Sequence, residues 1–340
     1  MADWVWSNVV VALLLMGTGG VVFYARRSRM WTETFSDLWR RRRFAVLVIG
    51  FYVLVALLDS VAWVGGMDQG EDTVARYEAQ SILDRLFAGS QERSYSAPFA
   101  DVEFYGGAPL THPGAHILGT DLIGRDVLYL SLKGARVALL IGGLTSLLAI
   151  PLALLFGISA GYFGGRIDDV VFFVMSTLAS MPGLLLLIAL IMVLGKSTVA
   201  VCFALAITGW VGFCRVVRGE TFKLRELEYV SAARALGVSE FGIIVRHILP
   251  NLMHLVIITF VLMFSGLVLS EAILSWLGIG VDGSWGQMID QARNELSRDP
   301  IVWWNIVSAG LALFGLILAV NFVGDALRDT LDPRTLRETE

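Results

Sequence analysis

The chain has 340 residues, of which 56% are hydrophobic and 16% are charged, and its mean hydropathy is +0.70. Because a soluble domain carries about a quarter charged residues, this composition excludes a soluble globular protein. It predicts an all-α membrane protein with several spans. The formal net charge of −4 gives no indication of nucleic-acid binding. Both cysteines, Cys202 and Cys214, lie in one apolar stretch, so we expect small buried side chains rather than a disulfide framework.

Seven apolar stretches approach the roughly 20 residues that a membrane span requires. The first, "WVWSNVVVALLLMGTGGVVFY", is alternatively a signal peptide. It lacks a basic start and leads directly into "ARRSR", so we expect it to be retained as a span. The expected spans cover residues 4–24, 44–64, 135–160, 170–194, 198–217, 252–274 and 302–323.

Lysine and arginine accumulate in segments that alternating spans place on one side of the membrane. They cluster after the first span, over 215–246, in the C-terminal tail and at Arg166. Since basic residues concentrate in cytoplasmic loops, that side is expected to be the cytoplasm. Seven spans then place the N-terminus outside and the C-terminus inside.

This topology divides the chain into five parts. They are an extra N-terminal span with a basic cytoplasmic linker (1–43), a first core span (44–64), an external insertion ending in a surface helix (65–134), a core with a cytoplasmic loop at 218–250 (135–325), and a cytoplasmic tail (326–340). The insertion is acidic and bears aromatic residues, so we expect an external lobe over 65–117 that contacts a protein partner, with a helix at about 74–88. The alternative is a solvated insertion with only local packing. The glycines and aspartates of 276–300 predict turns followed by a short helix.

The external insertion ends in "LGTDLIGRDV", whose glycines permit a tight path. Asp121 and Arg125 lie four residues apart and are expected to pair if this segment is helical. We expect an ordered external turn with a gating or supporting role, formed by Gly119, Thr120, Asp121, Gly124, Arg125 and Asp126. Glu271, at the outer end of a span, either reaches water or lines the pathway, and the sequence leaves both interpretations open.

No catalytic residue and no metal site is predicted by the sequence. "LGKST" at 194–198 resembles the end of a phosphate loop, but the first glycine of that pattern is missing, so we expect a turn between spans. His112 and His116 have helical ligand spacing, but a Pro-Gly pair between them opposes a helix and no flanking carboxylate completes a site. His247 and His254 suit an interface role as well as a ligand role.

The stretch "EYVSAARALGVSEFGIIVRHILPN" (228–251) carries a structure of its own between two apolar runs. Good helix formers precede Gly237, a natural helix stop; Ser239 then begins a second helix, which Pro250 is expected to end. The alanines make the first helix narrow, so that it fits a groove on another protein. The alternative is an amphipathic connector resting on lipid headgroups, but the first helix has little apolar bulk for that role.

Residues 231–250 resemble the coupling loop of binding-protein-dependent ABC importer permeases. That pattern is Glu-Ala-Ala, three residues, Gly, nine residues, Ile, any residue, Leu-Pro. Ser231 takes the place of the glutamate and His247 that of the isoleucine. The residues that match at the right spacing are Ala232, Ala233, Gly237, Leu249 and Pro250.

Three further segments occur in the same order as in the dipeptide/oligopeptide/nickel permeases and are similar to the C-type subunit of that pair. They are "LGTDLIGRDVLYLSLKGARVAL" (118–139), "EAILSWLGIGVDGSWGQMI" (271–289) and "VNFVGDALRDTLDPR" (320–334). The resemblance implies a type I ABC importer permease core of six transmembrane helices, to which this chain adds one extra N-terminal transmembrane helix.

The resemblance also implies how such a chain works. ATP and Mg²⁺ are held by two cytoplasmic ABC ATPase subunits and not by this chain, which binds no cofactor of its own. A second, B-type permease and a periplasmic substrate-binding protein are the other protein partners, in the bacterial inner membrane and in contact with its lipid. The residues implied in ATPase coupling are Glu228, Tyr229, Ala232, Ala233, Arg234, Ala235, Leu236, Gly237, Leu249 and Pro250.

The expected function is therefore ATP-driven import of dipeptides or oligopeptides. Two alternatives stay open at this point. One is a permease of the same family for nickel chelates or a peptide antibiotic. The other, from a different class, is a secondary carrier that works without ATPases.

Overall fold

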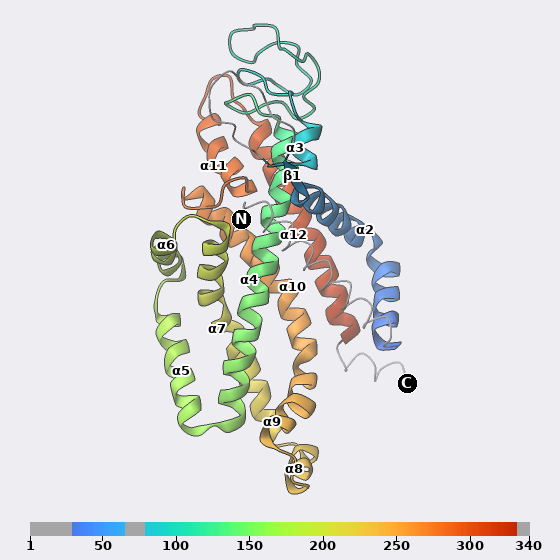
Figure 1. The fold of residues 1–340 in the computed structure, drawn as a ribbon, viewed down its shortest axis with the longest axis vertical. Coiled ribbons are helices and arrows are strands. Elements are labelled where there is room, and N and C mark those ends of the chain that lie inside the picture. The colour runs from blue at the N-terminus through green and yellow to red at the C-terminus, as the bar shows by residue number, and fades with distance from the viewer. Residues whose placement is uncertain (1–28, 65–78, 332–340) are drawn as a thin grey trace. The chain divides into compact units, whose positions relative to one another are not determined.

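The computed structural model describes residues 29–64 and 79–331. These residues form helices α2 to α12 in chain order and one two-stranded sheet (Figure 1). They fall into two compact units: the described residues up to Leu139 with Ser275–Ala326, and Leu140–Leu274 with the described residues from Leu327. The expected core 135–325 contributes to both units. The first expected span, 4–24, lies outside the described residues.

Five described helices are long and apolar enough to cross a membrane. They are Arg42–Ser60 within α2 (Arg29–Ser60), α4 (Val127–Phe163), α7 (Thr198–Arg225), the continuous segment Glu240–Trp276, and Trp304–Asp329 within α12 (Trp304–Leu331). The backbone leaves helical geometry at Arg42, which separates the span in α2 from the turns before it. These helices confirm the spans expected at 135–160, 198–217, 252–274 and 302–323, and most of the one expected at 44–64, which ends at Ser60 because residues 62–64 form a strand.

The span expected at 170–194 differs from the prediction, because it is broken. It consists of α5 (Gly165–Ser180) and α6 (Gly183–Leu194), which are bent by 93° and give a sixth span only if they count as one. Met181 takes an extended backbone conformation before Pro182, as steric conflict with a following proline ring favours. The expected apolar segment is therefore bent, and the Met-Pro-Gly sequence at 181–183 is the reason.

The separate surface helix expected before the third span is also wrong. α4 runs for 37 residues from Val127 without interruption and takes in both segments. Asp126 caps its first turn, since Oδ1 accepts from the backbone N–H of Leu128 at 2.8 Å and of Tyr129 at 3.4 Å. No proline occurs between this cap and the middle of the apolar stretch, so the helix simply continues into it.

Pro250 does not end a helix, contrary to the sequence prediction. α9 (Glu240–Ile243), a π-helical turn (Ile244–Ile248) and α10 (Leu249–Trp276) follow one another without a break. A proline removes one backbone N–H and its ring crowds the carbonyl four residues earlier. The wider π turn directly before α10 accommodates that change, as π turns inside longer helices commonly do.

In the unit that contains the N-terminal described residues, two short strands are the exception to an all-α fold. β1 (Ala62–Val64) pairs antiparallel with β2 (Ala79–Ser81), with Ala62 opposite Ser81. Ser81 then caps α3 (Ile82–Leu86) through a capping box with Asp84. The helix expected at 74–88 is therefore only partly right, because its residues 79–81 form β2 and only 82–86 are helical, whereas 65–78 lies outside the described residues. The short helix expected in 276–300 is confirmed as α11 (Trp285–Glu295).

In the other unit, α4 and α7 approach each other closely through two glycines one turn apart. A Cβ on Gly157 would lie 2.7 Å from Val217 Cγ1, and a Cβ on Gly161 would lie 2.7 Å from the carbonyl oxygen of Arg218. Such small residues let helix backbones approach inside a membrane. Cys202 and Cys214 on α7 are both buried free thiols, in agreement with the expected packing role.

Candidate functional site

Helix α8 (Glu228–Ala235) is the short helix expected in the polar loop, and glycine ends it as the sequence indicates. Gly237 has φ +78°. Its N–H donates to the carbonyl of Arg234 at 3.0 Å, and the N–H of Val238 donates to the carbonyl of Ala233 at 3.1 Å. These two bonds define a Schellman motif, which glycine favours because the left-handed conformation crowds any Cβ. Ser239 then caps α9 through the N–H of Gly242, as expected.

The two faces of α8 have different roles. Val230 and Ala233 are buried in the hydrophobic core of their unit. The alanine at 233 is therefore not part of a surface for a partner's groove, and that part of the sequence interpretation is wrong. The exposed face presents Glu228, Tyr229, Ala232, Ala235 and Leu236, of which Leu236 is 84% exposed. Phe241, on the helix that follows, adds a ring that is 76% exposed.

One end of α8 is tied to the end of α4 by a polar cluster. Tyr162 is 5% exposed, and its hydroxyl donates to Glu240 Oε2. Arg234 Nη2 donates to the same hydroxyl at 3.2 Å, while Arg234 Nε lies 3.6 Å from Glu240 Oε1. The hydroxyl of Tyr162 raises the pKa of Arg234, with Glu240 adding to the effect. Arg234 therefore stays cationic.

The other end of α8 is tied to α10. Asn251 Nδ2 donates to the Tyr229 hydroxyl at 3.1 Å and to the carbonyl of His247 at 2.6 Å. The rings of Tyr229 and His247 lie 6.1 Å apart between centroids, which favours the interface role for this histidine. Leu249 and Pro250 lie in the same helical run, directly after the π turn. All ten residues expected in coupling thus belong to one unit, around α8 and the start of α10.

Two arginines of α7 hold the turn between α4 and α5. Arg225 Nη1 donates to the carbonyl oxygens of Gly161 at 3.0 Å and Tyr162 at 3.4 Å, which satisfies the last carbonyls of α4. Arg218 pairs with Asp168 on α5, with Nη2 2.7 Å from Oδ2. Phe222 lies between the two guanidinium groups, 4.9 Å and 4.8 Å from their centres. These bonds hold the end of α4 in place, and Arg234 of the polar loop is bonded to that end through Tyr162.

The turn expected on the external side lies in the other unit and is ordered by Asp121. This carboxylate is 1% exposed and accepts from the backbone N–H of Arg125 at 2.8 Å and from Arg125 Nε at 2.9 Å. The pair forms across a turn and not along a helix, which corrects the expected geometry. Asp121 is buried, whereas Arg125 is partly exposed. Gly119 and Gly124 both have positive φ, and a Cβ on Gly124 would overlap the backbone of Glu92.

A buried polar cluster fixes the external lobe to the start of α4. His116 is fully buried, with Nδ1 2.9 Å from Asp126 Oδ2 and Nε2 3.5 Å from Glu92 Oε1. Burial alone would raise the pKa of Glu92, but bonds from the backbone N–H groups of Thr111 and His112 outweigh it and hold the pKa at about 2. The sequence showed no carboxylate flanking His112 and His116, but in the fold Glu92 contacts both rings and Asp126 contacts that of His116. In residues 29–64 and 79–331 no group of three or more His, Cys, Asp or Glu side chains is placed to hold a metal.

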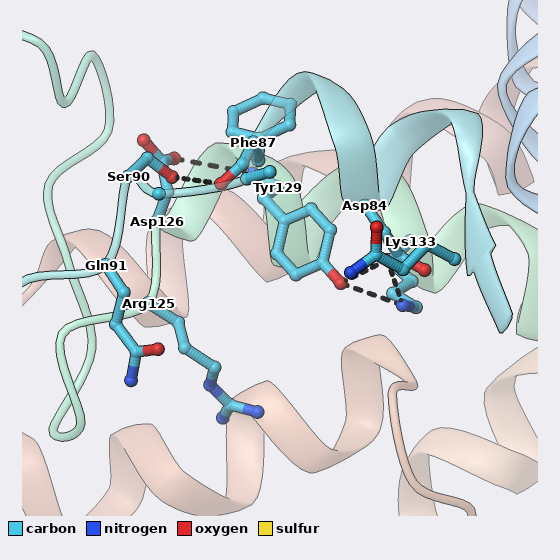
Figure 2. A pocket seen from close by; sticks show the side chains of 11 residues that line it. Asp84, Phe87, Ser90, Gln91, Arg125, Asp126, Tyr129 and Lys133 are labelled. Carbon is cyan, nitrogen blue, oxygen red and sulfur yellow. Dashed lines mark hydrogen bonds and ion pairs between the residues drawn. The ribbon is translucent and has the colours of Figure 1, made fainter. Parts of the chain in front are cut away.

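A pocket of about 460 Å³ opens between α3, the loop after it and the start of α4. Figure 2 shows Asp84, Tyr129 and Lys133 converging at one end of this pocket and Gln91 beside Arg125 at the other. Asp84 Oδ1 accepts from Tyr129 and from Lys133, each at 2.6 Å. Burial raises the pKa of Asp84, but the bonds from Lys133, Tyr129 and Ser81 outweigh it and bring the pKa to about 2.

Two further predicted site residues are buried. Thr120 is fully buried, and its carbonyl accepts from Trp304 Nε1 at 2.9 Å. Glu271, in the other unit, is 4% exposed, so its carboxylate does not reach the surface of this chain. Whether it lines the pathway stays a prediction.

The residues that sequence reasoning missed are Tyr162, Asp168, Arg218, Glu240 and Asn251, whose partners are distant in sequence.

The geometry defines a multi-span helical membrane protein that exposes a short helix on a fixed polar base. Residues 153–337 match the family model described as binding-protein-dependent transport system inner membrane component. The chain belongs to this family, and it is a multi-pass inner-membrane protein.

Proteins similar to this chain over most of their length are permeases. The chain is 34% identical to the dipeptide transport system permease protein DppC of Bacillus subtilis (strain 168), over 65% of this chain and 70% of that protein. It is 34% identical to the oligopeptide transport system permease protein OppC of Haemophilus influenzae, over 66% of this chain and 72% of that protein. A chain of the MetNI methionine ABC transporter, solved in an inward-facing conformation, has a TM-score of 0.50 at 18% identity. It covers 60% of this chain and 97% of that chain, which shows a shared fold.

Proposed function

We propose that this chain is the C-type permease subunit of an ATP-driven importer of dipeptides or oligopeptides. The relatives named above are dipeptide and oligopeptide transport permeases, and they match over about two thirds of the chain. The observation that carries the proposal is α8, a narrow helix that is closed by Gly237, buries Val230 and Ala233, and exposes two alanines and Leu236. Such a surface fits insertion into a groove of a cytoplasmic ATPase.

In this proposal ATP hydrolysis, translocation and delivery of the substrate are carried out by different subunits. Two ATPases bind ATP and Mg²⁺ and act on α8, a B-type permease completes the pathway, and a periplasmic binding protein delivers the peptide. The chain itself is not catalytic. Its N-terminus faces the periplasm and its C-terminus the cytoplasm, because the arginines around α8 then lie inside.

A growth experiment tests the proposed cargo. A bacterial strain that lacks this gene and requires alanine is supplied with dialanine, and free alanine serves as the control. We expect growth on dialanine to need the wild-type gene, while growth on alanine does not. Unchanged growth on dialanine together with lost nickel uptake would assign the chain to the nickel-chelate branch instead.

Copurification tests the ATP-driven mechanism separately. A tagged wild-type chain, extracted in mild detergent, is expected to bring with it a second permease and two ATPase subunits. A chain that purifies alone and still supports uptake in membrane vesicles without ATP would instead be a secondary carrier.

Reporter fusions after Ser36 and after Arg334 are both expected to report the cytoplasm.

A further inference from the structure

The hydroxyl of Tyr162 is the point at which three separate elements meet. It donates to Glu240 at the start of α9 and accepts from Arg234 near the end of α8, at 3.2 Å. Tyr162 itself belongs to α4. A single oxygen atom therefore joins the short helix, the helix that follows it and α4.

Tyr162 is held by packing around its ring and by hydrogen bonds at its backbone. The side chain is 5% exposed and belongs to the hydrophobic core of its unit. The carbonyls of Gly161 and Tyr162 are fixed by Arg225 from α7. A displacement of Arg234 or Glu240 is therefore passed to the backbone of α4 and is not absorbed by rotation of the ring.

The other contacts of α8 are less suited to this task. Val230 and Ala233 make apolar contacts, which have no preferred direction and permit sliding. The bond between Asn251 and Tyr229 joins two neutral groups that are both exposed. Arg234 and Glu240 are exposed as well, but both are charged and meet at the hydroxyl of a buried tyrosine. Hydrogen bonds to charged groups are shorter and about twice as strong as neutral ones, so the Arg234–Tyr162–Glu240 cluster is the contact of α8 best suited to pass on a movement.

We propose that Tyr162 is a positioning residue that passes the movement of α8 into α4 through its hydroxyl. The inference rests on the proposed function, in which an ATPase moves α8. It separates two properties of the loop. The exposed face of α8 serves binding of the ATPase, and the buried hydroxyl serves the transfer of movement after binding.

The test is the variant Tyr162→Phe in the complete importer, purified with its partner permease, ATPases and binding protein in lipid nanodiscs. Phenylalanine keeps the ring in the core and removes only the hydroxyl. ATP hydrolysis is measured with and without binding protein loaded with dialanine. Tyr52→Phe is the matched control, because its hydroxyl donates to the carbonyl of Ala312 in the other unit.

We expect Tyr162→Phe to keep wild-type subunit stoichiometry and basal hydrolysis. The ratio of stimulated to basal hydrolysis is expected to fall about tenfold, the scale of a lost hydrogen bond to charged groups. Tyr52→Phe is expected to keep the wild-type ratio. Arg234→Gln should lower the ratio too, and combining it with Tyr162→Phe should add little, because both remove one linked contact.

Three outcomes overturn the inference in different ways. A wild-type ratio in Tyr162→Phe shows that the hydroxyl transmits nothing and leaves the proposed function standing. If Tyr162→Phe lowers basal hydrolysis by the same factor as it lowers the amount of bound ATPase, Tyr162 supports assembly only. Absence of stimulation by loaded binding protein in the wild-type complex itself overturns the proposed function, and the inference with it.

Discussion

Replacing Gly237 isolates the contribution of one backbone conformation to the shape of α8. Its φ of +78° lies in the left-handed region, and a Cβ added there meets no atom within 4 Å. Crowding by neighbours therefore contributes nothing, and the whole cost of Gly237→Ala is backbone strain of about 1 kcal/mol. Asparagine tolerates this conformation better than alanine, so Gly237→Asn should cost less.

Hydrogen exchange of the backbone amides measures this cost directly. The N–H groups of Leu236, Gly237 and Val238 all donate to carbonyls of α8, so they exchange when the helix end opens. A cost of about 1 kcal/mol raises the open population about fivefold, and Gly237→Ala should speed exchange over 232–238 by that factor. Gly219→Ala is the control, since that glycine lies within α7 and an added Cβ also meets nothing. Equal exchange in the two variants would refute the assignment of strain to Gly237.

Four further substitutions test the packing around the site and the lobe. Ala232→Trp should abolish ATPase recovery at unchanged thermal stability, because the side chain is exposed, whereas Ala233→Trp should also lower the melting temperature, because the side chain is buried. Gly161→Leu should destabilise the purified chain by about 1–3 kcal/mol by forcing α4 from α7, which a denaturant titration measures against Gly143→Ala, where a Cβ meets nothing. Glu92, whose pKa falls from 4.5 to about 2 on folding, stabilises the lobe above pH 4.5, and this stabilisation is lost as pH falls from 4.5 towards 2. Pepsin cleavage within the lobe should rise across that window, and Glu92→Gln should flatten the rise.

The positions of the spans and of the α8 loop could be predicted because both depend on local signals. Span length and hydropathy locate helices in a membrane, where every backbone polar group needs an internal partner. Gly237 and Ser239 mark the end of one helix and the start of the next through rules that involve only neighbouring residues. The ordered turn around Asp121 is local in the same sense, although its carboxylate binds across the turn and not along a helix.

Predictions failed where a local rule met a competing contact or a more flexible backbone. Pro250 was expected to end a helix, but the π turn before it lets the helix continue. Pro182 had the opposite outcome, because the extended residue before it is followed by a bend of 93°. The same residue type thus breaks one apolar run and not another, and the difference lies in the turns that precede each proline.

The direction of a small side chain was the other feature that sequence could not give. Ala232 and Ala233 are equivalent as residues and adjacent in the motif, yet only the second faces the core. That orientation is set by Val230 and Ala233 packing as a pair on one side of a helix of only eight residues. Its phase follows from where the chain enters from α7, which no local pattern specifies.

The polar base of α8 follows from this one-sided packing. A helix of eight residues is too short to be stable in water by itself, so its position has to be supplied by the surrounding unit. Two buried apolar side chains fix its depth, while Arg234 and Tyr229 fix its two ends to α4 and α10. Tyr229 and Arg234 are partly exposed at the borders of the packed side, so Ala232, Ala235 and Leu236 on the far side stay available. The same packing therefore fixes one side of α8 and leaves Ala232, Ala235 and Leu236 exposed on the other. Together these two features suit α8 to bind a partner and pass on its movement.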